Sequence, residues 1–363
     1  MTSNLRVGII GANARGGWAG EAHVPAVQGL DGLELAAVAT NSRETADEAA
    51  HAFGVGKAYD DGHALIADPD IDILTVATRV PDHRALVLAA IAAGKHVYSE
   101  WPLGRGIAEA GEMADAARVA GVHDAIGLQL HGSPVFTAAR RHLGDGRIGR
   151  VLSLRAYSTS AGFGPKTAVS AAYLEDPASF ANLVTIQGAH TLDLLLALAG
   201  PATAMSALLS RQYPMVTVGD VTPRARETFD HLLAQGTLDG GAPFTLEVVG
   251  GRTKDTPFRL DIVGERGTLS LDGGAPRGLQ SSRIGLLLDG NRIEVDEGEL
   301  AGLSDAAANV AGLYARLRDD IRAGTRTAPG FAHAVRLTRL VETLFISSDE
   351  GRRLPVDAGD NIG

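Results

Sequence analysis

The sequence predicts an α/β fold of two domains, the first built on a doubly wound parallel sheet and the second on a mostly antiparallel one. Its 363 residues exceed what a single core usually organises. In the first third, short apolar runs alternate with helical segments, as a parallel sheet requires. Later strand-like segments follow one another without helices between them, which is typical of an antiparallel sheet. We therefore expect domains over residues 1–128 and 129–363.

The first domain shows this alternation along its whole length. Apolar runs predict its strands, and the segments between them are predicted to be helical. The expected strands are 5–10, 33–39, 57–59, 71–77, 96–99 and 123–128, and the expected helices follow Gly16 and cover 43–53, 62–67, 81–93 and 107–120.

The second domain is expected to begin with a helix and to end with two amphipathic helices, the last of which can pack back on the first domain. Residues 159–180 are rich in glycine, serine and proline, and we expect them to form a mobile loop over the site. The expected helices are 134–143, 190–199, 303–323 and 332–350, and the expected strands include 151–159, 232–238, 243–249, 258–263 and 267–271.

The turn after the first strand indicates a dinucleotide site. Gly11 permits a tight turn and Gly16 lets the next helix approach the sheet, so that helix's first N–H groups can face a pyrophosphate. Asn13 stands where the middle glycine of G-x-G-x-x-G is expected, so a plain strand-to-helix turn is the alternative. The candidate contacts are Gly11, Ala12, Asn13, Arg15 and Gly16.

The end of the second strand indicates which dinucleotide binds. An NAD site usually carries an acid here for the ribose 2′-hydroxyl, and none is present. Thr40 and Ser42 offer hydroxyls, Asn41 lies between them, and the Arg43 guanidinium would attract a 2′-phosphate. NADP(H) is therefore favoured, with NAD as the alternative cofactor and a solvated polar loop as the alternative interpretation.

Composition excludes several classes of function. The absence of cysteine excludes disulfides, thiolate metal sites and a cysteine nucleophile, and the histidines show no H-x-x-x-H or H-E-x-x-H spacing, so we expect no metal. A net charge of −10 without a long basic cluster argues against nucleic acid as a partner. No membrane span and no signal peptide are expected, which makes the cytoplasm the default location and small molecules the expected partners.

Polar residues also follow the later strands of the first domain. The carboxyl edge of an open parallel sheet is where ligands bind. Solvated loop residues are the alternative for each candidate except Trp101, for which burial in the core is the alternative. The candidates are Thr78, Arg79 and His83 after the fourth strand, Glu100 and Trp101 after the fifth, and Gln129 and His131 after the sixth.

Several segments together resemble the Gfo/Idh/MocA family, named after glucose-fructose oxidoreductase, inositol dehydrogenase and MocA. The resemblance implies a Rossmann domain, then an α/β domain whose large open sheet often forms the interface of a homodimer or homotetramer. It also implies hydride transfer between a nicotinamide and a sugar, cyclitol or related hydroxyl compound. The segments that carry it are Val7-Gly8-Ile9-Ile10-Gly11, Ala67-Asp68-Pro69-Asp70-Ile71-Asp72, Ala93-Gly94-Lys95-His96-Val97, Glu100-Trp101-Pro102-Leu103 and Gly188-Ala189-His190-Thr191-Leu192-Asp193.

Two departures from the family pattern bear on catalysis. Trp101 replaces the lysine of Glu-Lys-Pro, and Ile186 replaces an aspartate four residues before the family's histidine, which is His190 here. The surrounding residues are similar to the branch that includes the yeast galactose-pathway repressor, a dinucleotide-binding regulator. A sugar-directed oxidoreductase and a non-catalytic regulator or sensor that contacts a protein partner are therefore both open.

The residues themselves favour the oxidoreductase. Oxidation of an alcohol needs a group that takes the hydroxyl proton, and histidine suits that task, so His190 is the candidate acid/base. Asp193 can orient its imidazole, or can simply favour the first helical turn by its charge. Trp101 offers an aromatic face and an indole N–H to a ring-shaped ligand. Packing at a helix start is the alternative for His190.

Overall fold

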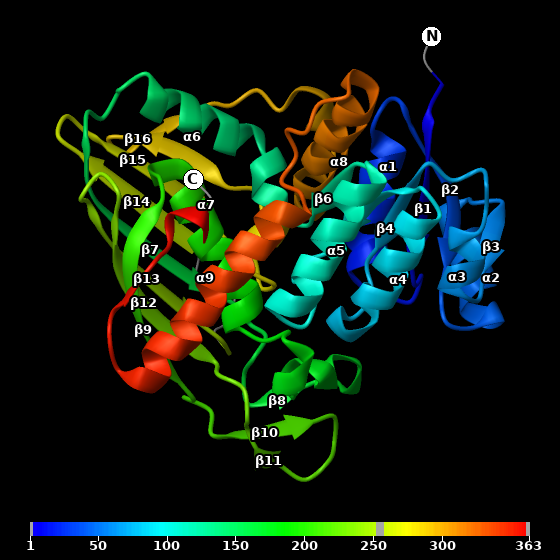
Figure 1. The fold of residues 1–363 in the computed structure, drawn as a ribbon, viewed down its shortest axis with the longest axis horizontal. Helices are drawn as coiled ribbons and strands as arrows, with labels where there is room; N and C mark the ends of the chain where they lie inside the picture. The colour runs from blue at the N-terminus through cyan, green and yellow to red at the C-terminus, as the bar shows by residue number, and fades with distance from the viewer. Residues whose placement is uncertain (1–2, 252–257, 361–363) are drawn as a thin grey trace. The chain divides into compact units, whose positions relative to one another are not determined.

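The computed structural model describes residues 3–251 and 258–360, and the chain divides into two compact units (Figure 1). The first unit comprises residues 1–133 and 297–335, and the second comprises 134–296 and 336–363. The first boundary lies at residue 133, close to the expected 128, but residues 297–335 return to the first unit, which the expected division does not include. Helix α8 (Asp305–Ala323) explains the return, since its side chains belong to the same hydrophobic core as strand β1 (Leu5–Ile10).

The sheet of the first unit is parallel throughout and has the order β3-β2-β1-β4-β5-β6. This order confirms the predicted Rossmann fold, in which two halves meet between β1 and β4. The remaining strands are β2 (Leu33–Ala39), β3 (Lys57–Tyr59), β4 (Ile73–Val76), β5 (His96–Ser99) and β6 (Asp124–Ile126).

The helices of the first unit lie close to their predicted positions. Ser42 begins α2 because its side chain accepts a hydrogen bond from the Thr45 N–H. Gly54 and Gly121 end α2 and α5 in the left-handed conformation. Besides α8, the helices of this unit include α1 (Val24–Gly29), α2 (Arg43–Phe53), α3 (Gly62–Ile66), α4 (Val80–Ala92) and α5 (Ile107–Ala120).

The turn after β1 confirms one predicted glycine role and corrects another. Gly11 has a φ of 94°, and a Cβ there would lie 2.5 Å from the Ala77 carbonyl oxygen, so only glycine fits the turn. Gly16 has a φ of 131° but a Cβ there would meet no atom within 4 Å, so it supplies conformation and not close packing. A π-helical turn, Ala19–His23, then leads into α1.

The second unit is built on a nine-stranded sheet of order β17-β16-β15-β14-β7-β13-β12-β9-β18. Strands β7 and β13 pair in parallel and the other neighbours are antiparallel, which confirms a mostly antiparallel sheet. The strands are β7 (Val151–Thr159), β9 (Ala202–Ser210), β12 (His231–Leu238), β13 (Pro243–Val249), β14 (Phe258–Gly264), β15 (Thr268–Gly273), β16 (Gly285–Leu288), β17 (Asn291–Ile293) and β18 (Leu354–Pro355).

Helices cover one face of this sheet. Helix α7 (Ala189–Ala199) contacts β7 and β13, and α6 (Pro134–Gly144) contacts α7. The last helix, α9 (Phe331–Glu350), protects the edge strand β9 beyond its short pairing with β18. Ser347 and Ser348 accept hydrogen bonds from the N–H groups of Ala207 and Leu209 at 3.0 and 2.9 Å, so these edge groups are satisfied.

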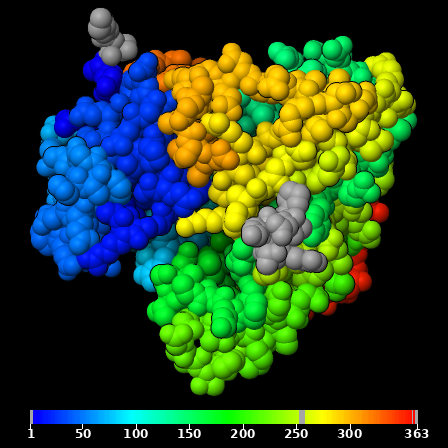
Figure 2. Space-filling model, turned by 180° about the vertical axis from the view of Figure 1, so that it is seen from behind, coloured from blue at the N-terminus to red at the C-terminus, as the bar shows by residue number. Residues whose placement is uncertain are grey.

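Apolar side chains are exposed on the other face of the sheet. Leu208 of β9 and Leu233 of β12 lie directly opposite one another and are 58% and 41% exposed. Val263 of β14 is 37% exposed. In Figure 2 the yellow residues, which include β14 and β15, lie at the surface. Such a face is open to contact with other molecules.

Residues 159–180 differ from the predicted mobile loop. They contain the short strand β8 (Lys166–Thr167) and 3₁₀ turns over Val169–Glu175 and Pro177–Ser179. Strand β8 pairs with β10 (Met215–Val218), which also pairs with β11 (Arg224–Ala225). The buried Glu175 side chain binds Arg226 at 2.9 Å, which anchors the second half of the segment.

Candidate functional site

Three of the predicted residues follow neighbouring strands at the carboxyl edge of the first sheet. Thr78 follows β4, Glu100 follows β5, and Gln129 follows β6. The Gln129 amide donates to both carboxylate oxygens of Glu100, at 3.1 and 3.0 Å. The Thr78 hydroxyl oxygen is buried and has no hydrogen-bond partner within the described part of the chain. At this edge the Glu100 carboxylate is therefore held by hydrogen bonds, and the Thr78 hydroxyl can still form one with a ligand.

Sequence reasoning missed His23, whose ring also binds Glu100. Its Nε2 lies 3.0 Å from Glu100 Oε1, and its Nδ1 lies 2.9 Å from the Tyr314 hydroxyl of α8. That hydroxyl lies 2.7 Å from Thr75 Oγ1 in the middle of β4. His23, Thr75 and Tyr314 are fully buried, so the chain of contacts is shielded from water.

Two tyrosines pack around the His23 ring. The rings of Tyr98 and Tyr314 are stacked with centroids 4.7 Å apart, and both meet His23 edge-on, at 5.1 and 5.7 Å. Burial raises the pKa of both phenols well above the usual range, so each remains a hydroxyl donor at physiological pH. The only sequence signal for this cluster was a histidine in the helical segment after the glycine turn.

Arg15 is held by acidic residues of α2. Asn13 accepts a hydrogen bond from the Arg15 N–H at 2.8 Å, which shapes the turn. The Arg15 guanidinium donates to Glu48 and Glu44 at 2.6 Å each, and these hydrogen bonds raise its pKa above the usual range. Because Arg15 is 57% exposed, solvent screens these pairs and an anion can compete for the guanidinium.

The predicted 2′-phosphate residues lie at the start of α2. Thr40 Oγ1 lies 2.7 Å from the Thr45 hydroxyl, and Ser42 caps the helix. Arg43 donates to the Ala58 carbonyl at 2.8 Å and pairs with Asp47 at 3.2 Å, yet half of its side chain is exposed. Asn41 is exposed between them.

His83, a predicted cofactor contact, is buried, and both of its ring nitrogens lie beside backbone carbonyls. Its Nδ1 lies 3.0 Å from the Pro102 carbonyl oxygen and its Nε2 lies 3.1 Å from that of Thr78. Burial lowers the pKa of this imidazole despite these carbonyls. His83 therefore holds the strand ends together, while the neighbouring Arg79 is exposed and pairs with Asp82 at 3.4 Å.

His190 and Asp193 lie in the first turns of α7 in the second unit. A π-helical turn, Val184–Gly188, runs directly into this helix, and Asn182 accepts hydrogen bonds from the N–H groups of Val184 and Thr185. His190 is 6% exposed and Asp193 is 3% exposed. Such π turns are rare and occur often at functional sites, which agrees with the candidate role of His190.

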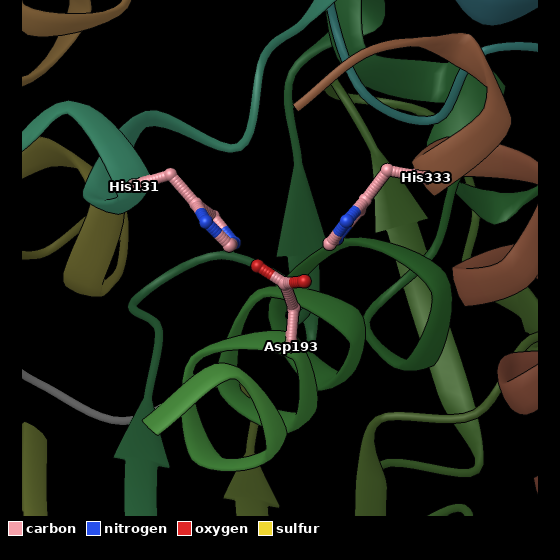
Figure 3. Close-up of side chains that lie close together, drawn as sticks. All are labelled: His131, Asp193 and His333. Carbon is pink, nitrogen blue, oxygen red and sulfur yellow. The ribbon is translucent and has the colours of Figure 1, made fainter. Parts of the chain in front are cut away.

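Trp101 and His131 are both buried within the first unit. Trp101 is 5% exposed and directly follows Glu100. The rings of His131 and His333 are 5.1 Å apart and nearly perpendicular. Figure 3 labels this pair together with Asp193 of the second unit. Sequence analysis named His131 as a candidate ligand contact because it follows the sixth strand. It did not name His333, which lies about two hundred residues further along the chain.

Membrane crossing is not supported by any helix within residues 3–251 and 258–360, because none is both long and apolar enough.

Comparison with known proteins agrees with this architecture. Residues 5–127 match the GFO_IDH_MocA model, described as an oxidoreductase family with an NAD-binding Rossmann fold, and residues 134–273 match that of the Gal80p C-terminal domain. The dehydrogenase aclE of Aspergillus oryzae is 29% identical over 286 residues, which are 75% of this chain and 78% of that protein.

Two further relatives differ in their named activities. Levoglucosan dehydrogenase of Pseudarthrobacter phenanthrenivorans is 31% identical over 58% of this chain and 55% of its own length. The structure of a super-repressor mutant of Gal80p from Saccharomyces cerevisiae superposes with a TM-score of 0.86 at 25% identity, over 99% of both chains. Residues 5–127 are thus similar to the Gfo/Idh/MocA family of oxidoreductases with an NAD-binding Rossmann fold, and residues 134–273 are similar to the Gal80p C-terminal domain.

Proposed function

We propose that this chain is an NADP(H)-dependent oxidoreductase that transfers hydride to or from a hydroxyl or keto carbon of a sugar- or cyclitol-like compound. The observation that carries the proposal is the polar carboxyl edge of the first sheet, where His23 and Gln129 bind Glu100 after β5 and the buried Thr78 hydroxyl after β4 is without a partner in the described part of the chain. Levoglucosan dehydrogenase, a relative named for a sugar derivative, supports the substrate class.

The residues at this edge fit a dinucleotide. Gly11 makes the tight turn that such a site needs, and the buried Thr78 hydroxyl can bond to a ligand. Exposed Arg43 and Arg15 flank the start of α2, where a 2′-phosphate would also meet backbone N–H groups. These two cations favour NADP(H) over NAD.

In the proposed reaction the nicotinamide, when bound, accepts or donates the hydride. During oxidation the substrate O–H proton passes to His190 Nδ1 or Nε2 as the carbonyl forms, and the reverse proton transfer accompanies reduction. The buried position of His190 at the start of α7 excludes most water from it. Asp193 is proposed to orient the imidazole, and Trp101 to offer a flat apolar face to the ring of the substrate.

A non-catalytic regulator is the second candidate. Its support is Trp101, which occupies the family's lysine position and is only 5% exposed, together with Ile186 in place of the family's aspartate. Gal80p, one of the relatives of known structure, is named as a regulatory protein of galactose and lactose metabolism. In this reading the exposed sheet face around Leu208 and Leu233 contacts a protein partner.

The same face supports self-association in the enzyme reading. Leu208 and Leu233 are paired and exposed on the sheet, and a monomer rarely exposes a large contiguous apolar patch. We propose a homodimer or homotetramer formed through this face. Sedimentation of wild type and of Leu208→Glu would detect the assembly.

The deciding experiment follows NADPH and NADH absorbance against aldoses, ketoses and cyclitols in both directions. Turnover on any member of the panel supports the oxidoreductase. Silence across the panel by folded, cofactor-loaded protein contradicts it and favours the regulator, which a pull-down with the purified chain would then test.

A further inference from the structure

For a neutral His23 imidazole, the hydrogen bonds around its ring have one consistent direction. A carboxylate oxygen only accepts, so His23 Nε2, 3.0 Å from Glu100, carries a proton. In a neutral imidazole Nδ1 then accepts from the Tyr314 hydroxyl at 2.9 Å, and the Tyr314 oxygen accepts from Thr75 at 2.7 Å. Every group in this chain from β4 to β5 thus finds a partner.

This series of hydrogen bonds, from Thr75 through Tyr314 and His23, fixes the Glu100 carboxylate more firmly than a surface contact can. Its inner members, Thr75, Tyr314 and His23, are fully buried, so water cannot replace a missing partner. Gln129 also donates to both oxygens of Glu100. The Glu100 side chain nevertheless remains 14% exposed, so it can still face a ligand.

Glu100 lies in the half of the sheet that receives the nicotinamide end of a dinucleotide. In a Rossmann fold the pyrophosphate binds after β1, and the two mononucleotide halves extend to either side of the point where β1 and β4 meet. Arg43 follows β2 on one side, whereas Glu100 follows β5 on the other. The oxidised nicotinamide ring is positively charged and the reduced ring is neutral, so a fixed negative group there discriminates between them.

We propose that His23 and Tyr314 are positioning residues for Glu100, and that their buried hydrogen-bond chain makes the carboxylate favour the oxidised over the reduced cofactor. This inference rests on the proposed dinucleotide binding. It gives helix α8, from the last quarter of the chain, a specific role at the cofactor site of the first unit.

The test measures dissociation constants for NADP⁺ by calorimetry and for NADPH by fluorescence, without any substrate. Glu100→Gln keeps the shape but removes the charge, so it should lower the preference for NADP⁺ about tenfold. Tyr314→Phe keeps the stacking on Tyr98 but leaves His23 Nδ1 without its donor. It should lower the same preference about threefold.

The matched control is Tyr59→Phe, which removes a tyrosine hydroxyl bonded to Asp68 at 2.9 Å in the same unit. This variant should leave the ratio of the two constants unchanged. Thr75→Val removes the hydrogen bond between Thr75 and the Tyr314 hydroxyl without altering a ring. It allows the same measurement if Tyr314→Phe does not fold. Its effect should be smaller than that of Tyr314→Phe and in the same direction.

The outcomes separate the inference from the proposed function. A shift of the ratio in Tyr314→Phe or Thr75→Val but not in Tyr59→Phe supports the inference. If both cofactor forms bind equally more weakly, or if the ratio of the two dissociation constants is unchanged, the hydrogen bonds have only a structural role. That result overturns the inference but leaves dinucleotide binding intact. Failure of folded wild type to bind either form overturns both.

Discussion

Arg226 and Glu175 form an ion pair of 2.9 Å in which both side chains are buried. Arg226 also binds Asp230 at 2.8 Å and donates to the carbonyl oxygens of Phe163 and Gly164 at 2.6 Å each. Removing one member leaves the other charges buried and uncompensated, which is costly. This cluster therefore fixes residues 163–175 to the strands of the second unit.

The first prediction follows from that cluster. Glu175→Ala should lower the free energy of unfolding of the second unit by about 3 to 5 kcal/mol, the usual result of breaking a buried ion pair. Urea unfolding followed by circular dichroism measures it. The control is Glu265→Ala, which breaks an exposed pair with Arg150 and should leave the unfolding midpoint nearly unchanged. Equal effects of the two variants would contradict the structural role of the cluster.

The buried anchor in residues 159–180 was not predicted, for a physical reason. Their glycine, serine and proline content indicates a loop, but the partner that anchors Glu175 lies 51 residues further along the chain. The His23 site was missed for the same reason, because its partner Tyr314 lies 291 residues further along the chain. Sequence periodicity reports local structure and the face of an element that is buried. It does not report which distant polar side chain completes a site.

Most of the first unit could be predicted because its signals are local. Alternating apolar runs and helices predict the parallel sheet, and the expected element bounds lie within a few residues of those observed. Strand ends in such a sheet meet at one edge, so Glu100 and Gln129 were both found from sequence. His83 was placed at the same edge, but burial turned its ring towards two carbonyls.

The second prediction concerns acid stability of the first unit. Burial alone would raise the pKa of Asp68, but hydrogen bonds from Lys57, the Asp70 N–H and Tyr59 outweigh it and lower the pKa to about 2. Because the folded-state pKa lies below the unfolded value, this carboxylate stabilises the fold above about pH 4, and the stabilisation is lost as pH falls towards 2.

Asp68→Asn should therefore have a lower free energy of unfolding than wild type at pH 7, and the difference between the two proteins should become smaller below pH 4. Thermal unfolding across this pH range measures the difference. Asp60→Asn, at an exposed position, should show no such difference. A difference for Asp68→Asn that stays constant from pH 7 to pH 2.5 would disprove the linkage.

The third prediction concerns the choice of cofactor. Arg43 is half exposed at the start of α2, where it can turn from Asp47 to a 2′-phosphate. Wild type should bind NADPH more tightly than NADH. Arg43→Asp should lower the ratio of the NADH to the NADPH dissociation constant by a factor of about ten to a hundred. Nicotinamide fluorescence titration measures both constants. Arg84→Asp, at an exposed pair with Glu112, is the control, and equal affinity of wild type for both cofactors would sink the NADP(H) proposal.

The last prediction separates the enzyme from the regulator. If His190 is the acid/base, His190→Ala should lower turnover by about 10² to 10⁴-fold on any substrate found in the panel. NADPH affinity should remain nearly intact, because the turn at Gly11 and the start of α2 belong to the first unit and His190 to the second. His142→Ala, on α6 of the same unit, is the control for losing a histidine.

The rate of wild type should also depend on pH through the protonation of that imidazole, and His190→Ala should lack the dependence. Trp101→Lys is the companion variant. It restores the family's lysine but leaves Ile186 in place of the aspartate, so we expect no new activity and weaker binding of a ring-shaped substrate, since an aromatic face contributes about 1 kcal/mol. Turnover that survives in His190→Ala with an unchanged pH profile would assign the proton transfer to another residue.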